Sequence, residues 1–84
     1  MYEILLERGA ERDLKKLPKG MFDRVVLSIK SLAQNPKPHG TRKIIGSKND
    51  WRIRGGDCRV IYEIDEEVKA VKVMRIRHRR EAYR

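Results

Sequence analysis

The sequence is poor in the residues that build disulfides, metal sites and membrane spans. It has a single cysteine, Cys58, so an internal disulfide is excluded, and the histidines His39 and His78 lie far apart in the chain. No carboxylate cluster has metal-ligand spacing, which argues against a metal-dependent mechanism. No apolar run approaches the roughly 18 residues of a membrane span, and no charged-then-apolar leader opens the chain. We expect a cytoplasmic protein that uses no membrane, metal or small-molecule cofactor.

Acidic charge is also scarce relative to basic charge. Lys and Arg number 21 against 12 Asp and Glu, which gives a formal net charge of +9 on 84 residues. A chain of this length, with 39% hydrophobic residues, predicts one domain, residues 1–84, with a modest core. The charge predicts attraction to polyanions and salt-sensitive association. Nucleic acid is the leading partner, and an acidic protein segment is the second.

The first half of the chain changes from strand to helix periodicity. Residues 2–6 alternate apolar and polar side chains, which predicts a short first strand. Apolar residues between 10 and 17 recur at helical spacing, and Pro18 starts a new element. Residues 22–33 carry apolar side chains at intervals of three and four, which predicts an amphipathic helix. A Pro- and Gly-containing loop at 35–40 ends it, so we expect a helical hairpin.

The second half has period two and predicts four further strands, at residues 43–45, 51–54, 59–64 and 68–77. A short helix or tail is expected at 79–84. This order predicts an α+β fold: an N-terminal strand and a helical hairpin packed on one face of a mostly antiparallel four- to five-stranded sheet.

Arginines share one face of this expected sheet. Trp51 and Ile53 alternate with Arg52 and Arg54, so the two arginines face away from the helices. Arg59 is expected to join them across the intervening turn, because Val60, Tyr62 and Ile64 alternate to the opposite face. Trp51 and Tyr62 are accordingly assigned to the core rather than to base stacking.

The last predicted strand has a less regular pattern. Arg75 and Arg77 share a face, but Val71 and Val73 fall in the same phase as these arginines. The pattern predicts a strand that is buried on both faces at its start and emerges toward a polyanion site at its end.

The final ten residues concentrate side chains suited to an RNA backbone. Arginine matches phosphate oxygens and keeps its charge, histidine titrates near neutral pH, and tyrosine can stack on a base. A solvated basic tail is the alternative interpretation of this run. The expected RNA-binding residues are Arg52, Arg54, Arg59, Arg75, Arg79 and Arg80.

In order and spacing, the chain resembles the RelE/ParE toxin superfamily, and within it the RelE branch of ribosome-dependent mRNA endonucleases. The resemblance rests on the opening strand, the hairpin motif at 14–18, the Trp-Arg-Ile-Arg run at 51–54, residues 56–62 and residues 77–83. It implies a toxin of a type II toxin–antitoxin system. It also implies a cognate antitoxin partner that wraps the toxin with an acidic to amphipathic segment. The implied reaction is metal-independent cleavage of mRNA in the ribosomal A site, by attack of a ribose 2′-oxygen on the adjacent phosphate.

The resemblance also implies residue roles. Arg52 and Arg54 match a basic pair that is lysine in the best-studied branch, and Arg59 matches a phosphate-binding arginine. An arginine stays protonated and stabilises charge, so His78 becomes the candidate proton acceptor. The expected catalytic residues are Arg54, Arg59, Arg77, His78 and Tyr83.

Two other functions fit the same sequence. A ParE-like protein with this fold would inhibit DNA gyrase without being an enzyme. A catalytically inactive RNA-binding module would use the same arginines to hold phosphate without cutting. Convergence of the basic residues near Tyr83 favours the endoribonuclease.

Overall fold

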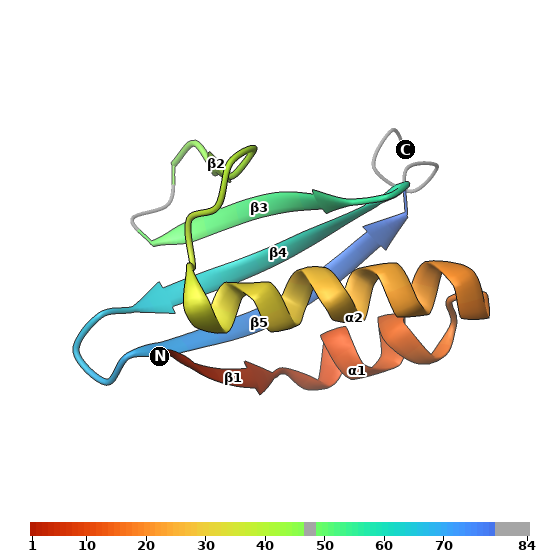
Figure 1. The fold of residues 1–84 in the computed structure, drawn as a ribbon, viewed down its shortest axis with the longest axis horizontal. Helices are drawn as coiled ribbons and strands as arrows, with labels where there is room; N and C mark the ends of the chain where they lie inside the picture. The colour runs from red at the N-terminus through yellow and green to blue at the C-terminus, as the bar shows by residue number, and fades with distance from the viewer. Residues whose placement is uncertain (47–48, 79–84) are drawn as a thin grey trace.

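The computed structural model describes residues 1–46 and 49–78 (Figure 1). In this part of the chain two helices pack against a five-stranded sheet of order β1-β5-β4-β3-β2. The strands are β1 (Glu3–Leu6), β2 (Arg42–Lys43), β3 (Asp50–Gly55), β4 (Cys58–Asp65) and β5 (Ala70–His78), and the helices are α1 (Arg8–Lys15) and α2 (Lys19–Gln34). The expected α+β fold with a helical hairpin on the sheet is confirmed. The predicted helix or tail at 79–84 lies outside the described residues.

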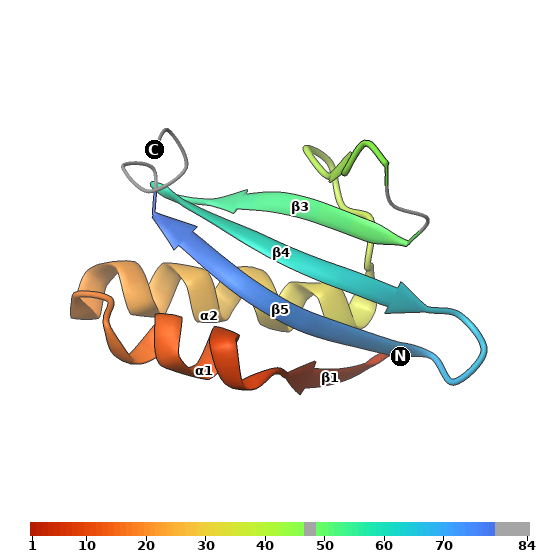
Figure 2. The same ribbon diagram turned by 180° about the vertical axis from the view of Figure 1, so that it is seen from behind.

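The sheet is antiparallel except at one edge. β2, β3, β4 and β5 pair antiparallel in sequence order, whereas β1 pairs parallel with β5. α2 lies across one face of the sheet, and the view from behind shows the strands in front of α2 (Figure 2). α1 follows β1 directly and lies alongside β5. One face of the sheet therefore carries the core, and no helix among the described residues covers the opposite face.

The core forms where the apolar faces of α2 and the sheet meet. Val25, Ile29 and Leu32 recur at helical spacing and are buried. On β4 the residues Cys58, Val60, Tyr62 and Ile64 are buried while the residues between them are partly exposed. The helix-facing side of this central strand is thus fixed, and Arg59 projects from the opposite side.

A β-bulge in β5 explains why valines and arginines fall in the same phase of this strand's sequence. Tyr62 pairs with Val73 while Ile61 pairs with Arg75, so Met74 is an extra residue opposite β4. An extra residue shifts the alternation by one position, which turns the side chains that follow it to the other face. The consecutive residues Ala70 and Val71 are both buried, so the strand starts buried on both faces, as the sequence pattern predicted. Val73 before the bulge and Ile76 after it both face the core.

Two strand boundaries also differ from the sequence prediction. The strand predicted at 43–45 is β2, Arg42–Lys43, and Ile45 beyond it is fully exposed. The chain turns there at Gly46, whose φ of 88° suits glycine. The last strand was predicted to begin at Val68, but Val68 and Lys69 belong to the turn after β4, where Lys69 has a φ of 54°.

Candidate nucleic-acid interface

Three neighbouring strands carry a row of arginines on the face opposite α2. Arg59 of β4 pairs with Arg54 on β3 and with Arg77 on β5. Directly paired residues in a sheet point to the same side with Cβ atoms about 5 Å apart, and like charges there are destabilising. Repulsion between these three paired arginines therefore lowers the stability of the folded chain.

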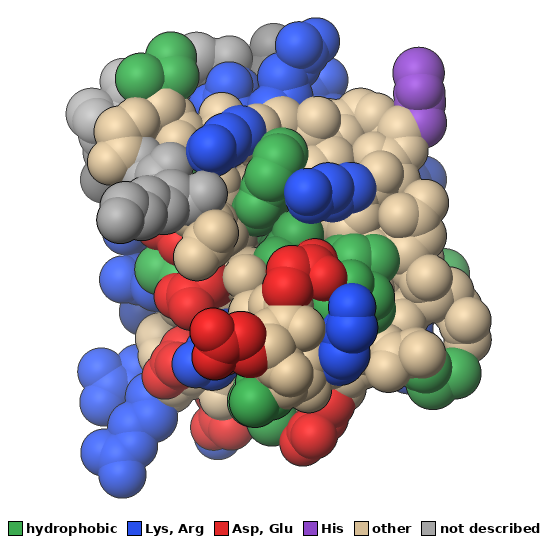
Figure 3. Space-filling model, turned by 90° about the vertical axis from the view of Figure 1, so that its left-hand side faces the viewer, with side chains coloured by type: hydrophobic (Ala, Val, Ile, Leu, Met, Phe, Trp, Pro, Cys, Tyr) green, Lys and Arg blue, Asp and Glu red, His purple; other side chains and the backbone are tan. Residues whose placement is uncertain are grey.

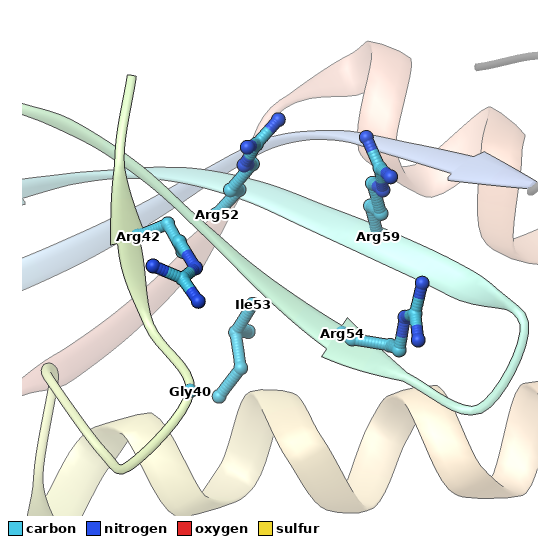
Figure 4. Close-up of a pocket in the computed structure, with 6 residues that line it drawn as sticks. All are labelled: Gly40, Arg42, Arg52, Ile53, Arg54 and Arg59. Atoms are coloured by element: carbon cyan, nitrogen blue, oxygen red, sulfur yellow. The ribbon is translucent and has the colours of Figure 1, made fainter. Parts of the chain in front are cut away.

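Arg52 and Arg42 extend this row toward the edge of the sheet. Arg52 precedes Arg54 by two residues on β3, and it pairs with Arg42 of β2. An open depression of about 380 Å³ is lined by Gly40, Arg42, Arg52, Ile53, Arg54 and Arg59. Figure 4 shows Arg52 and Arg59 extending to the same side, with Arg54 beside Arg59 and Arg42 coming from β2. We call Arg42, Arg52, Arg54, Arg59 and Arg77 the arginine cluster.

The loop before β2 is held in place by two aromatic residues of the sheet. The Tyr62 hydroxyl donates a 2.7 Å hydrogen bond to the Pro36 carbonyl, and burial raises the pKa of this hydroxyl. The Lys37 ammonium lies 4.6 Å from the centroid of the Trp51 ring. These contacts fix the loop that carries Gly40 to the rim of the depression. They also agree with the assignment of Tyr62 to the core.

Arg75 lies on the same face of β5 as Arg77, but its guanidinium forms an ion pair with Asp13 of α1. Its Nε donates to Asp13 Oδ2 at 2.9 Å and its guanidinium donates to Asp13 Oδ1 at 3.2 Å. Asp13 Oδ2 also accepts from the Ile76 amide at 2.8 Å. Partial burial alone raises the pKa of Asp13, but these hydrogen bonds, with the charges of Arg75 and Arg77, hold it below the ordinary value. The Arg75 guanidinium, which was expected to contact RNA, is therefore paired with the Asp13 carboxylate.

The strand register directs the His78 side chain to the helix-facing side of the sheet, opposite to Arg59. His78 pairs with Cys58, which is buried, and it follows Ile76 by two residues on β5. It lines a groove of about 340 Å³ with Lys16, Pro18 and Met21 of the helical hairpin. The register thus turns His78 away from Arg54 and Arg59, but Arg77 of the arginine cluster lines the same groove as His78. The other expected site residues Arg79, Arg80 and Tyr83 lie outside the described residues.

Two residues at this site, Arg42 and Asp13, are not identifiable from the sequence pattern. Arg42 was not selected because the two residues of β2 are too few for an alternating pattern. Asp13 was counted as one of the polar residues between apolar helix positions. One of two acids among five Lys and Arg at positions 8–19 is a weak signal of a role, and the partner 62 residues away is visible only in the fold.

Charge is distributed unevenly along the sheet. The arginine cluster lies toward the β3–β4 turn, while Glu63, Asp65, Glu66 and Glu67 line a depression at the other end. Figure 3 shows acidic side chains gathered at that end of the molecule. A polyanion would be attracted to one end of the sheet and repelled from the other. Among the described residues no group of three or more metal-ligating side chains could hold a metal ion. None of the helices found there has the length and apolar character to cross a membrane.

The comparisons with known proteins agree with this geometry. Residues 4–83 match the family model for the ParE toxin of type II toxin–antitoxin systems. The chain belongs to the RelE/ParE toxin superfamily. It is 32% identical to the toxin RelG of Mycobacterium tuberculosis over 87 aligned residues, which cover 99% of this chain and 97% of the relative. The protein is therefore a toxin of the type II class.

Solved structures of this superfamily share the fold. A toxin chain in the toxin–antitoxin complex RelBE2 from M. tuberculosis superimposes with a TM-score of 0.82 at 29% identity, covering 93% of this chain and 98% of that one. The RelE–RelB complex from Pyrococcus horikoshii also gives 0.82, at 26% identity, with 93% and 94% coverage. The expected superfamily membership is thus confirmed.

Proposed function

We propose that this toxin is a ribosome-dependent endoribonuclease that cleaves mRNA in the A site. The observation that carries the proposal is the row Arg54–Arg59–Arg77 across three strands, with Arg52 and Arg42 beside it. Guanidinium groups match phosphate oxygens, and an open depression lets a single RNA strand enter.

The chemistry follows from what arginine can and cannot do. In the proposed reaction a ribose 2′-oxygen attacks the adjacent phosphorus, and the bond from phosphorus to the 5′-oxygen breaks. Negative charge develops on the phosphate oxygens, and preorganised cations stabilise it. Arg54, Arg59 and Arg77 supply this stabilisation, and Arg52 and Arg42 hold the neighbouring backbone.

Proton transfer is assigned separately, because an arginine stays protonated at neutral pH. The 2′-hydroxyl must lose a proton and the departing 5′-oxygen must gain one. Tyr83 and His78 are the proposed participants from this chain, although the register starts His78 on the helix-facing side. The ribosome aligns the mRNA and can contribute groups of its own.

We also propose a cognate antitoxin as partner. The M. tuberculosis and P. horikoshii relatives were solved as toxin–antitoxin complexes. This chain has a net charge of +9 and exposes Phe22 and Leu27 on α2. A segment with acidic residues and an apolar helix face would complement both features. Co-purification with the product of a neighbouring gene tests this pairing.

Inhibition of DNA gyrase is the second candidate function, favoured by the match to the ParE toxin model. Brief induction of the toxin, followed by labelling of new protein and new DNA, separates the two. We expect protein synthesis to stop first, and Arg54→Gln to relieve the block. DNA synthesis that stops first, with mRNA intact, would favour gyrase inhibition.

A further inference from the structure

One ion pair between α1 and β5 lies at the border of the proposed RNA site. The carboxylate of Asp13 accepts two hydrogen bonds from Arg75 and one from the Ile76 amide. We call these three hydrogen bonds the Asp13 clasp. It joins α1 to the end of β5, immediately before Arg77.

The clasp holds the part of β5 that extends beyond its pairing with β1 and is paired only with β4 in the described residues. β1 pairs with β5 only from Ala70 to Val73, so the edge of β5 beyond Val73 has no strand beside it. Asp13 takes the place of a strand there, because its carboxylate accepts the amide hydrogen of Ile76 as a backbone carbonyl would. The backbone one residue before Arg77 is fixed in this way.

The side chains are built for this contact. The Asp13 side chain is 12% exposed, so its charge is shielded from water and its hydrogen bonds gain strength. Gly9 lies under the Arg75 side chain, and a Cβ atom at position 9 would be 2.8 Å from Arg75 Cδ. That distance is too short for two carbon atoms, so any larger residue at position 9 would force the Arg75 side chain to shift from its position against Asp13.

We propose that Asp13 is a positioning residue for the arginine cluster. Through Arg75 and the Ile76 amide, it sets the direction in which Arg77 leaves β5 toward the phosphate that Arg59 and Arg77 share. The bulge at Met74 lies just before this point and would otherwise allow the strand end to twist. The inference rests on the proposed function, and it assigns Arg75 to the clasp rather than to RNA.

Two variants break the clasp by different means. Asp13→Asn keeps the shape of the side chain but removes its charge and points an amide group at the donors of Arg75. Gly9→Ala leaves every charge in place and pushes Arg75 aside. Glu11→Gln is the matched control, because it removes one negative charge from the same helix at an exposed position. Alanine is also a better helix former than glycine, so α1 should persist in the second variant.

The readout is the single-turnover rate of mRNA cleavage on ribosomes, measured in three backgrounds. We expect Asp13→Asn and Gly9→Ala each to slow cleavage about tenfold in the wild-type chain, and Glu11→Gln to leave it unchanged. In an Arg77→Lys background the clasp variants should have little further effect, whereas in an Arg52→Lys background they should keep their full factor. This difference separates positioning of Arg77 from a general loss of structure.

Equal factors in the two backgrounds, or clasp variants that match Glu11→Gln, would overturn the inference. Amide hydrogen exchange at Ile76 and Arg77 reports the clasp without RNA, and it should accelerate in both clasp variants but not in the control. A wild-type toxin that cleaves no mRNA would overturn the proposed function. Unchanged exchange at these amides would overturn the clasp on its own.

Discussion

At the scale of single residues, the site is defined by like charges placed next to one another. Arg54 and Arg59 are directly paired across β3 and β4, and Arg59 is paired again with Arg77. Such pairs oppose folding, and the proposed RNA ligand, which carries negative charge, would offset this cost. In the proposed function, phosphate supplies that charge during binding, and more of it develops as the RNA backbone is cut.

Arg54→Gln should separate activity from stability. We expect cleavage on the ribosome to fall about a hundredfold, because one donor to the transition state is lost. The free energy of unfolding should stay within about 0.5 kcal/mol of the wild type, since Arg54 is exposed and a like-charge pair is removed. Lys30→Gln, an exposed change on α2, is the control that should alter neither quantity. A clear loss of stability in Arg54→Gln would assign this arginine a structural role.

Asp13 should make stability depend on acid. Its pKa is below the ordinary value in the folded chain, so its contribution is complete above about pH 4 and is lost as the pH falls through the folded pKa. We expect Asp13→Asn to lower the free energy of unfolding by about 2 kcal/mol near neutral pH. The difference from the wild type should shrink in strong acid, where both side chains are uncharged. Urea unfolding across the pH range measures it, and a constant difference would contradict the assignment.

At the scale of the elements, regular patterns could be predicted from the sequence and irregular ones could not. The spacing of Val25, Ile29 and Leu32 predicted α2, and the alternation along β4 predicted its buried face, because each depends on local periodicity alone. The bulge at Met74 depends on how β5 pairs with β4, and this pairing cannot be predicted from the sequence of one strand alone. The sequence pattern therefore predicted burial on both faces at the start of β5, but not the bulge.

The bulge decides which side of the sheet each residue at the end of β5 faces. It places Arg77 opposite Arg59 and His78 opposite Cys58, on different sides of the sheet. We therefore expect His78→Gln to reduce cleavage less than Arg77→Ala does and, because His78 is a proposed proton-transfer group, to flatten the pH dependence near neutrality. Parallel pH–rate profiles of the two variants test this order. A wild-type rate and pH profile in His78→Gln would remove His78 from the proposed proton transfer.

The loop before β2 should loosen when its anchor is removed. Tyr62→Phe deletes the hydrogen bond to Pro36 and keeps the aromatic ring in the core. We expect a loss of about 1 kcal/mol, equivalent to roughly 4–8 °C in melting temperature. Cleavage should also weaken, since Gly40 and Arg42 line the depression. Thermal denaturation and cleavage assays measure both effects, and an unchanged melting temperature would contradict the anchor.

At the scale of the whole molecule, the core and the arginine cluster lie on opposite faces of the sheet, and basic and acidic side chains lie toward opposite ends. One face of the sheet is used for the core beneath α2, and the other carries the arginine cluster. Acidic side chains at the far end of the sheet limit where a polyanion can lie. The general function could be expected from charge and motif order, whereas the position of Arg42 and the Asp13 clasp required the pairing of distant segments.

The chemical nature of the cut ends tests the central claim most directly. Purified toxin is mixed with ribosomes that hold a defined mRNA codon in the A site, and the termini of both fragments are analysed. The account predicts cleavage within that codon, with a 2′,3′-cyclic phosphate or 3′-phosphate on one fragment and a 5′-hydroxyl on the other. Arg54→Gln should give far less of the same products. Intact mRNA, or fragments with a 5′-phosphate, would contradict the account.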